Sequence, residues 1–196
     1  MKMKLMMIRH PVTIANIQGI VQHEVEGNVA PKGYKQIQEL VERLQSENFD
    51  NCYSSDAYRC RVLTEEILKY KNIPVCYSSV FREINNGVWN GNRKADVERL
   101  SLADPINTRP DGGESLQDLV NRSTQGLKTI VSQGGERNIL ISHGWFLKMF
   151  LGLQLGMNPV DAIKKLKFSN CAISEIELKE QGCLVEYLNN RDYLTR

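Results

Sequence analysis

The sequence contains few histidines, no paired cysteine motif and no cofactor-binding signature, and each absence excludes a class of protein. Its 196 residues include three histidines and five cysteines, and no two cysteines form a CxxC pair. An odd number of cysteines argues against a complete disulfide framework, so we expect buried, reduced thiols. The closest pair of histidines, His10 and His23, lacks the spacing of metal ligands on a helix. We therefore expect no metal and no other cofactor.

Charge and hydropathy exclude two kinds of partner. The formal net charge is +2, and no run of five like charges occurs, so we expect no nucleic-acid partner. A membrane helix needs about 20 apolar residues, and the most apolar stretch, 145–156, is shorter and carries Lys148 and Gln154. The apolar part of the initial MKMKLMMIRH is too short for a secretory signal. We expect a cytoplasmic protein with no membrane partner.

Apolar periodicity predicts alternating strands and helices. The predicted strands cover residues 4–8, 51–54, 138–142, 172–178 and 183–188. The predicted helices cover residues 31–46, 57–70 with Asp56 as N-cap, 116–131 after a Ser115 capping box, and 145–155. This order predicts an α/β fold, a three-layer α/β/α sandwich with a mostly parallel sheet and an antiparallel terminal pair.

The chain is long enough for one domain with a substantial core, so we expect residues 1–196 to form a single domain. Residues 81–110 are poor in periodicity and contain Gly87, Gly91, Pro105 and Pro110. This segment is therefore predicted to be a lid-like excursion over the site.

Two of the three histidines follow predicted strands directly. Arg9 and His10 follow the first strand, and His143 follows the strand that ends at Ser142. Carboxyl ends of parallel strands meet at one edge of a sheet, where ligands bind in such folds. A single histidine at a strand end is commonly structural, but two in equivalent settings beside an arginine indicate an active site.

Five motifs occur in order along nearly the whole chain: RHPVTIANIQGIVQ from Arg9, YSSDAYR, FREINNGVWNG, DGGES and ISHG. Together they resemble the motifs of the histidine phosphatase superfamily, the phosphoglycerate-mutase-like enzymes. The resemblance implies the phosphoglycerate-mutase-like fold and the phosphatase branch. It further implies catalytic residues Arg9, His10, Arg59, Glu83 and His143, and substrate-binding residues Thr13, Asn16, Gln22 and Gly144.

The residue types fit phosphoryl transfer without the resemblance. Phosphoryl transfer depends mainly on positioning and charge stabilisation, and Arg9 and Arg59 can each offer a planar fork to phosphate oxygens. Unprotonated His10 would be the nucleophile, because histidine titrates near pH 6.5, while His143 would hydrogen-bond the phosphoryl oxygens, best when protonated. Glu83 would protonate the leaving group, which requires a pKa raised by burial or by the phosphate charge.

Several other residues have simpler expected roles. Arg61 and Glu65 should form a solvated pair on a helix, His23 should be exposed, and Trp145 should pack in the core. Asn170 should support the site from behind.

One residue departs from the motif. Pro11 stands where the family has glycine, and proline fixes φ and removes an N–H group. The leading hypothesis remains a histidine acid phosphatase-type phosphomonoesterase, a hydrolase whose partner is a small-molecule phosphate ester. One alternative is a phosphoglycerate mutase, although residues 92–111 offer only Arg93, Lys94, Arg99 and Arg109 to hold a second phosphate. Another is a binding module without turnover. The sequence does not identify the substrate or decide between a monomer and a homo-oligomer.

Overall fold

The computed structural model describes residues 2–22, 27–101, 104 and 106–195. Two short 3-10 turns lie at Ser79–Phe81 and Gly87–Trp89. The strands are β1 Met3–Arg9, β2 Asn51–Ser55, β3 Val75–Ser78, β4 Arg137–Ser142, β5 Ile173–Leu178 and β6 Cys183–Asn190. The helices are α1 Ile14–Gln18, α2 Pro31–Leu44, α3 Tyr58–Leu68, α4 Lys94–Ser101, α5 Leu116–Gln133, α6 Gly144–Gln154 and α7 Pro159–Lys165.

The strands form one six-stranded sheet in the order β3-β2-β4-β1-β5-β6. The first four strands in this order run parallel, while β5 pairs antiparallel with both β1 and β6. The mixed α/β class and the antiparallel terminal pair are confirmed. Because β4 lies between β1 and β2, three neighbouring parallel strands end at the same edge, which is where the predicted site residues follow them.

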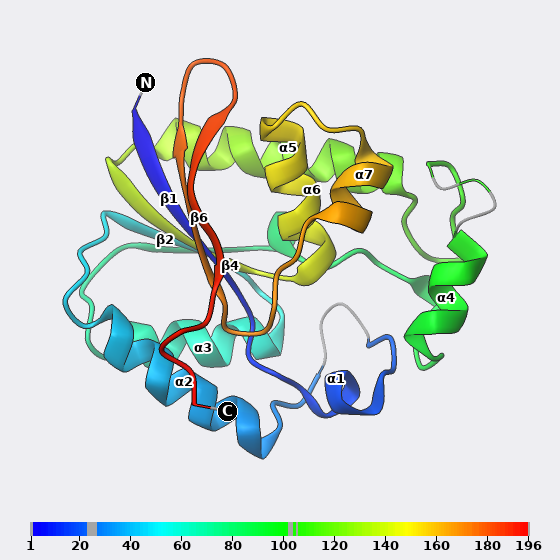
Figure 1. The fold of residues 1–196 in the computed structure, drawn as a ribbon, viewed down its shortest axis with the longest axis horizontal. Helices are drawn as coiled ribbons and strands as arrows, with labels where there is room; N and C mark the ends of the chain where they lie inside the picture. The colour runs from blue at the N-terminus through cyan, green and yellow to red at the C-terminus, as the bar shows by residue number, and fades with distance from the viewer. Residues whose placement is uncertain (1, 23–26, 102–103, 105, 196) are drawn as a thin grey trace.

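Side chains alternate between two apolar cores on opposite faces of the sheet. Along β1, Met3, Leu5 and Met7 belong to one core, which also contains Phe146 and Phe150 of α6. Met6 and Ile8 belong to the other core, beneath α2 and α3. Successive strand residues point to opposite faces, so one strand supplies both cores. Figure 1 shows the resulting three layers, with α5 and α6 on one side of the strands and α2 and α3 on the other.

Two predicted helix starts are confirmed and one is wrong. Pro31 occupies the first turn of α2, and Ser115 caps α5 in a reciprocal capping box with Asp118. Asp56 is not the N-cap of α3: that position is Ala57, which makes no side-chain cap. The Asp56 carboxylate instead forms a bidentate ion pair with Arg82, at 2.6 and 2.7 Å. The reason is tertiary, because Arg82 lies in a distant segment that folds against this turn.

The segment predicted as a lid-like excursion is more regular than expected. It begins at the last residue of the first 3-10 turn and contains the second 3-10 turn and the helix α4, which, like β3, α1 and α7, was not predicted. In Figure 1, α4 lies at one side of the molecule, away from the strands. No helix in the described ranges is long and apolar enough to cross a membrane.

Candidate active site

The sheet register brings the two predicted histidines together. Arg9 pairs with Ser142 across β1 and β4, and the amide of His10 donates to the Ser142 carbonyl at 2.9 Å. The next residues, His10 and His143, have ring centroids 5.2 Å apart. Arg59 begins α3, directly after β2 on the other side of β4. Backbone pairing therefore fixes the relative positions of these side chains.

His10 has the protonation state that a nucleophile requires. Its side chain is buried, and Nδ1 lies 2.7 Å from the carbonyl oxygen of Pro11. A carbonyl only accepts hydrogen bonds, so Nδ1 carries the proton and Nε2 keeps its lone pair. Burial, followed by the charges of Arg59 and Arg9, holds the pKa of His10 well below 6.5. The ring is therefore neutral near pH 7.

Pro11 supplies this contact as well as glycine would. The group that position 11 offers to His10 is its carbonyl, which proline retains, and not the N–H group that proline lacks. The departure from the family motif therefore leaves the orientation of the His10 ring intact.

His143 is held from both sides by buried polar groups. The Arg59 guanidinium donates to Nδ1 at 2.9 Å, so the neutral ring carries its proton on Nε2 and donates to the Ser55 hydroxyl at 2.8 Å. Burial is the largest cause, before the Arg59 charge, of a His143 pKa well below 6.5. The expected protonated form is therefore not the resting form. Ser55 was missed, although it lies within the YSSDAYR motif.

The Arg9 side chain lines the cavity and contacts the segment before β5. Its Nη1 donates to the Phe168 carbonyl at 2.7 Å, while its Nε is buried without a hydrogen-bond partner among the described residues. Burial lowers the pKa of Arg9, and the nearby Glu83 charge opposes this effect. A Cβ atom on Gly144 would lie 3.4 Å from Arg9 Cζ and 3.6 Å from Glu83 Oε2. Both charged groups therefore lie within ordinary van der Waals distance of this position.

The Glu83 side chain caps the N-terminus of α6. His143, the N-cap of this helix, provides no side-chain cap. The Glu83 carboxylate accepts instead from the amide of Trp145, at 3.0 and 3.2 Å to its two oxygens, and from that of Phe146 at 3.2 Å. The first amides of a helix need acceptors and stabilise negative charge. The carboxylate is thereby fixed over the same helix that follows His143.

Two ion pairs hold the segment that carries Glu83. Arg82 pairs with Asp56 on one side of it. On the other side, Arg122 of α5 binds both oxygens of Glu114, at 2.8 and 2.7 Å. The Arg122 guanidinium also donates to the carbonyls of residues 80, 82 and 83, at 3.1, 2.6 and 3.1 Å. Sequence reasoning missed Arg122, because nothing in the periodicity of its helix marks a contact with a segment some forty residues away.

Thr13 organises two neighbours and does not line the cavity. Its hydroxyl donates to Gln22 Oε1 at 3.0 Å and accepts from the Asn16 amide at 3.1 Å. Asn170, expected to support the site, donates to the His10 carbonyl at 2.9 Å and to Asn16 Oδ1 at 3.1 Å. These bonds place Asn16 and Gln22 at the cavity wall, where both were predicted.

Gly27 lies against Gln22 and Arg59 and was not predicted as a site residue. Its φ is +135°, a conformation that side chains rarely adopt. A Cβ atom there would lie 2.5 Å from Gln22 Oε1 and 3.3 Å from Arg59 Nη1. Residue 27 therefore has to be glycine for the chain to pass this close to both side chains.

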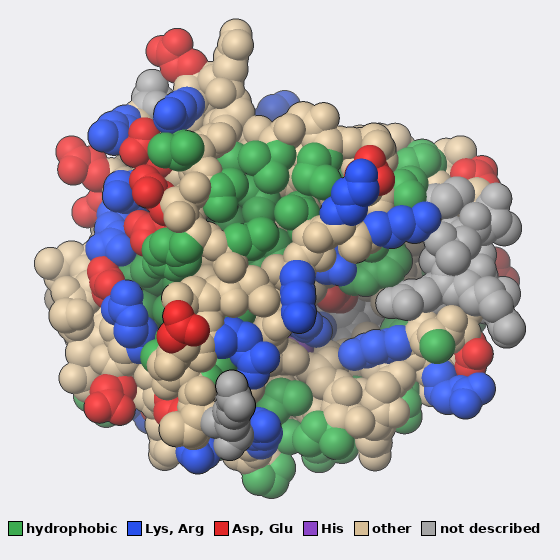
Figure 2. Space-filling model, in the orientation of Figure 1, with side chains coloured by type: hydrophobic (Ala, Val, Ile, Leu, Met, Phe, Trp, Pro, Cys, Tyr) green, Lys and Arg blue, Asp and Glu red, His purple; other side chains and the backbone are tan. Residues whose placement is uncertain are grey.

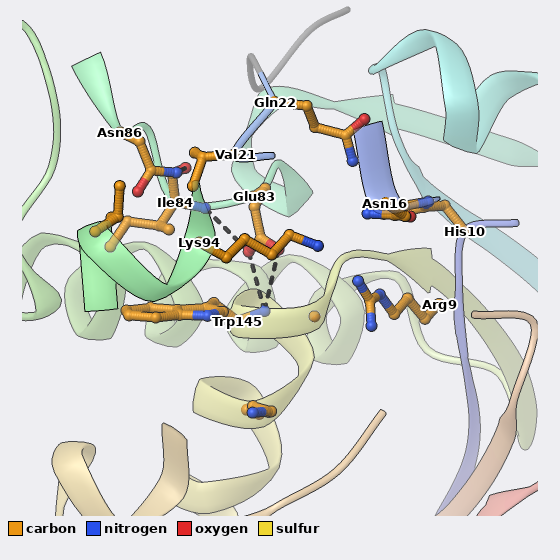
Figure 3. Close-up of a pocket in the computed structure, with 13 residues that line it drawn as sticks. Arg9, His10, Asn16, Val21, Gln22, Glu83, Ile84, Asn86, Lys94 and Trp145 are labelled. Carbon is orange, nitrogen blue, oxygen red and sulfur yellow. Dashed lines mark hydrogen bonds between the residues drawn. The ribbon is translucent and has the colours of Figure 1, made fainter. Parts of the chain in front are cut away.

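Six of the nine predicted residues line one cavity of about 230 Å³, namely Arg9, His10, Asn16, Gln22, Glu83 and Gly144, whereas Thr13, Arg59 and His143 do not. In Figure 3, Arg9, His10 and Asn16 lie on one side and Ile84 and Trp145 on the other, with Glu83 between them. Lys94 and Lys148 add two cations to the wall, and Gly144 lines it as well. Arg59 lies behind His143 and is fully buried. Trp145 is partly buried and packs against the core, as expected, and it also borders the cavity.

The remaining expectations have mixed outcomes. Arg61 and Glu65 form the predicted exposed pair at 3.3 Å, whereas His23 lies outside the described residues. All five cysteines are free thiols, three of them buried and two half-buried. Among the residues that the structure describes, no group of three or more His, Cys, Asp or Glu side chains could hold a metal ion.

Two related proteins show high coverage of the chain. Probable phosphoglycerate mutase GpmB of Salmonella choleraesuis is 28% identical over 193 residues, which cover 93% of this chain and 88% of that protein. Broad-specificity phosphatase YOR283W of Saccharomyces cerevisiae is 32% identical over 157 residues, covering 76% and 68%.

Solved structures share the fold over nearly the full length. The alpha-ribazole phosphatase from Shigella flexneri superposes with a TM-score of 0.87 at 21% identity, over 96% of both chains. Phosphoserine phosphatase from Entamoeba histolytica, in complex with 3-phosphoglyceric acid, gives a TM-score of 0.85 at 23% identity, over 98% and 100%.

The family model of the histidine phosphatase superfamily, branch 1, matches residues 5–191. This range includes the ends of all three central strands and the segment that carries Glu83. Sequence motifs, strand order and family match therefore agree, and the chain belongs to the histidine phosphatase superfamily.

Proposed function

We propose that the chain is a metal-independent phosphatase that hydrolyses a small phosphomonoester through a phosphohistidine on His10. The observation that carries this proposal is the state of His10: a neutral ring with Nδ1 tied to Pro11 and Nε2 unprotonated, at the wall of a cavity rich in cations. An imidazole in this state is a nucleophile without further activation.

In the first step, the phosphate of the substrate binds among the arginines. Nε2 of His10 attacks phosphorus, and the bond from phosphorus to the ester oxygen breaks. Glu83 gives its proton to that oxygen, so the alcohol leaves neutral. Arg9 and Arg59 stabilise the charge on the equatorial oxygens. The Nε atom of Arg9 has no hydrogen-bond partner among the described residues, so it can donate to one of these oxygens.

In the second step, water attacks the phosphohistidine. Glu83, now ionised, accepts a proton from the water, the bond between nitrogen and phosphorus breaks, and His10 regains its lone pair. The sum is one phosphomonoester and one water converted to one alcohol and one phosphate. Glu83 recovers its proton and is ready for the next cycle.

The binding of the phosphate dianion changes the charge balance of the site. In the resting site, His143 is neutral and faces the guanidinium of Arg59. A bound dianion offsets the positive charges that hold the pKa of this ring low, so protonation of His143 becomes favourable as the substrate enters.

The test is hydrolysis of an aryl phosphate by purified protein in the presence of a chelator. Wild type should turn over, and His10→Ala should lose activity by a factor on the order of 10⁴ or more. Rapid acid-free quenching with radiolabelled substrate should trap labelled protein in wild type and not in His10→Ala. The exposed variant Arg61→Ala serves as the control. Full activity in His10→Ala, or activity abolished by the chelator, refutes the proposal.

A phosphoglycerate mutase is the second candidate. It is favoured by the name of the Salmonella relative and by Lys94 and Lys148 at the cavity wall, which could bind a further anionic group. A mutase must protect its phosphohistidine from water. Isomerisation of a phosphoglycerate that outpaces release of inorganic phosphate would establish it in place of the phosphatase.

The third candidate, a binding module without turnover, was motivated by Pro11 alone. The contact that position 11 makes with His10 uses the carbonyl, and this supports an intact nucleophile over the binding module. We further propose that residues 1–196 act as one domain in the cytoplasm, where the five free thiols stay reduced. Fractionation of cells with an antibody to the chain tests the location.

A further inference from the structure

A second hollow lies directly beside the catalytic cavity. It is a groove of about 510 Å³, and it shares two lining residues, Arg9 and Lys148, with the cavity. Three more cations line it from separate elements: Lys32 from the first turn of α2, Lys167 from the segment after α7, and Arg191 after β6. No aspartate or glutamate of the described chain lines it. Figure 2 shows blue side chains gathered around the hollow in this face.

Three cations of the groove are not balanced by nearby carboxylates among the described residues. Several exposed cations elsewhere stand beside carboxylates, as in the pairs Lys35–Glu39 and Lys165–Asp161. Within the described ranges, Lys32, Lys167 and Arg191 have no carboxylate within ion-pair distance. Like charges that converge without counter-charges attract an anion.

A buried polar side chain at the wall adds a directed donor. Gln36 is only 6% exposed, and its Oε1 accepts from the Val12 amide at 3.0 Å. That contact fixes the orientation of the side-chain amide, and its nitrogen donates to no residue that the structure describes. The groove therefore combines several cations with one preorganised N–H donor, which suits a phosphate-type anion.

The size of the catalytic cavity gives this groove a role in substrate binding. Sites for small molecules commonly have volumes of about 300 to 1,000 Å³. The catalytic cavity, at about 230 Å³, is below that range, and the groove beside it more than doubles the space. A substrate that extends out of the cavity past Arg9 and Lys148 reaches a groove whose charged side chains are all positive.

We propose that the groove binds a second phosphate-type group of the substrate, remote from the phosphate that is cleaved. The proposal rests on the phosphatase function proposed above and deepens it: the preferred substrate is a bisphosphorylated metabolite, with a spacer that reaches from His10 to Gln36 and the three groove cations. The same anion chemistry could come from free phosphate acting as an effector, which the experiment separates.

The experiment compares straight-chain alkanediol bisphosphates of increasing length with the matching monophosphates. In wild type, kcat/KM should favour the bisphosphate at one spacer length, and the preference should weaken as salt rises. In the triple variant Lys32→Ala, Lys167→Ala, Arg191→Ala the preference should fall about tenfold, while the rate on monophosphates stays unchanged. The charge-matched control Lys35→Ala, Arg61→Ala, Lys165→Ala removes three paired, exposed cations and should keep the preference.

Three outcomes overturn the assignment. The first is that no spacer length gives a preference for the bisphosphate in wild type. The second is that the triple variant keeps the preference, and the third is that the control variant loses the preference to the same extent. Free inorganic phosphate that alters the rate on a monophosphate noncompetitively, without any bisphosphate preference, assigns the groove to an effector instead. If no phosphomonoester is turned over, the phosphatase function fails, and calorimetry of the same bisphosphates with wild type and triple variant still tests the groove.

Discussion

The two halves of the active site are held in place by different kinds of interaction. Arg9, His10 and His143 follow neighbouring strands, and backbone pairing fixes their spacing. Glu83 lies on a segment between 3-10 turns, and the Arg82–Asp56 and Arg122–Glu114 ion pairs hold that segment. We call these the strand-end half and the loop half.

The difference shows where the site is rigid and where it depends on a few side chains. The strand-end half is buried among the sheet residues, so a change there alters charge and hydrogen bonding without moving the backbone. The loop half relies on polar contacts that are partly exposed, with side-chain exposures of 16% for Arg122 and 23% for Glu114. Loss of one such contact frees a segment rather than a single group. Variants in each half should therefore fail in different ways.

Removal of Arg59 should have the largest effect, through the strand-end half. Arg59→Ala removes the group that donates to His143 Nδ1 and, in the proposed mechanism, a donor to the phosphate. We expect kcat/KM to fall by a factor on the order of 10³, since loss of one preorganised donor costs 10² to 10³. Steady-state kinetics measures this beside Arg61→Ala, which alters an exposed pair on the same helix and should stay near wild type. A loss below tenfold contradicts the role of Arg59.

Removal of Arg122 should act through the loop half. Arg122→Met removes its bonds to three carbonyls and to Glu114, so Glu83 loses its fixed position. We expect kcat on an alkyl phosphate to fall about 10²-fold, because small misplacements of a catalytic group are costly. An aryl phosphate should lose much less, since its leaving group needs no proton.

Two further measurements separate this effect from unfolding. Thermal denaturation should show a loss of about 1 to 3 kcal/mol for Arg122→Met, because Glu114 is left without its partner. The control Arg109→Met breaks an exposed pair with Asp118 and should leave the ratio of alkyl to aryl rates unchanged. Equal losses of kcat on the alkyl and the aryl phosphate would contradict the positioning role of Arg122.

Stability should fall as pH drops below 6.5, because of the strand-end half. The folded pKa values of His10 and His143 lie well below 6.5, so the unfolded chain takes up protons first as pH decreases. Each histidine then reduces the free energy of unfolding by up to about 1.4 kcal/mol per pH unit. Denaturant titrations from pH 8 to about 5 measure the slope, before carboxylates dominate. His143→Asn should flatten it, and an unchanged slope argues against a neutral buried ring.

Replacement of Pro11 should have the smallest effect. Pro11→Gly restores the family residue and keeps the carbonyl that accepts from His10 Nδ1. We expect kcat to change less than about threefold, and stability to decrease by about 0.4 to 1 kcal/mol as the unfolded chain gains freedom. Kinetics and denaturant titration on the same samples check both values. A large gain in kcat would mean that proline limits turnover through a feature other than this carbonyl.

Much of the strand-end half could be predicted from local pattern. The apolar stretch from Leu5 to Ile8 marks a buried strand, and the histidines that follow β1 and β4 had to meet once those strands are parallel neighbours. The Ser115 capping box could also be predicted from the sequence, because its partners are three residues apart. Asp56 was misassigned for the opposite reason: its partner Arg82 is distant in sequence.

The sequence by itself determined the α/β class, the family and the residues that gather at the strand ends, because periodicity and ordered motifs are local signals. Only the tertiary structure decided that Arg122 and Glu114 hold the loop of Glu83 and that His143 rests neutral against Arg59. It also decided that cations from α2 and from the segments after α7 and β6 converge on one groove. Each of these depends on side chains that are remote in sequence, and burial and charge act between them through space rather than along the chain.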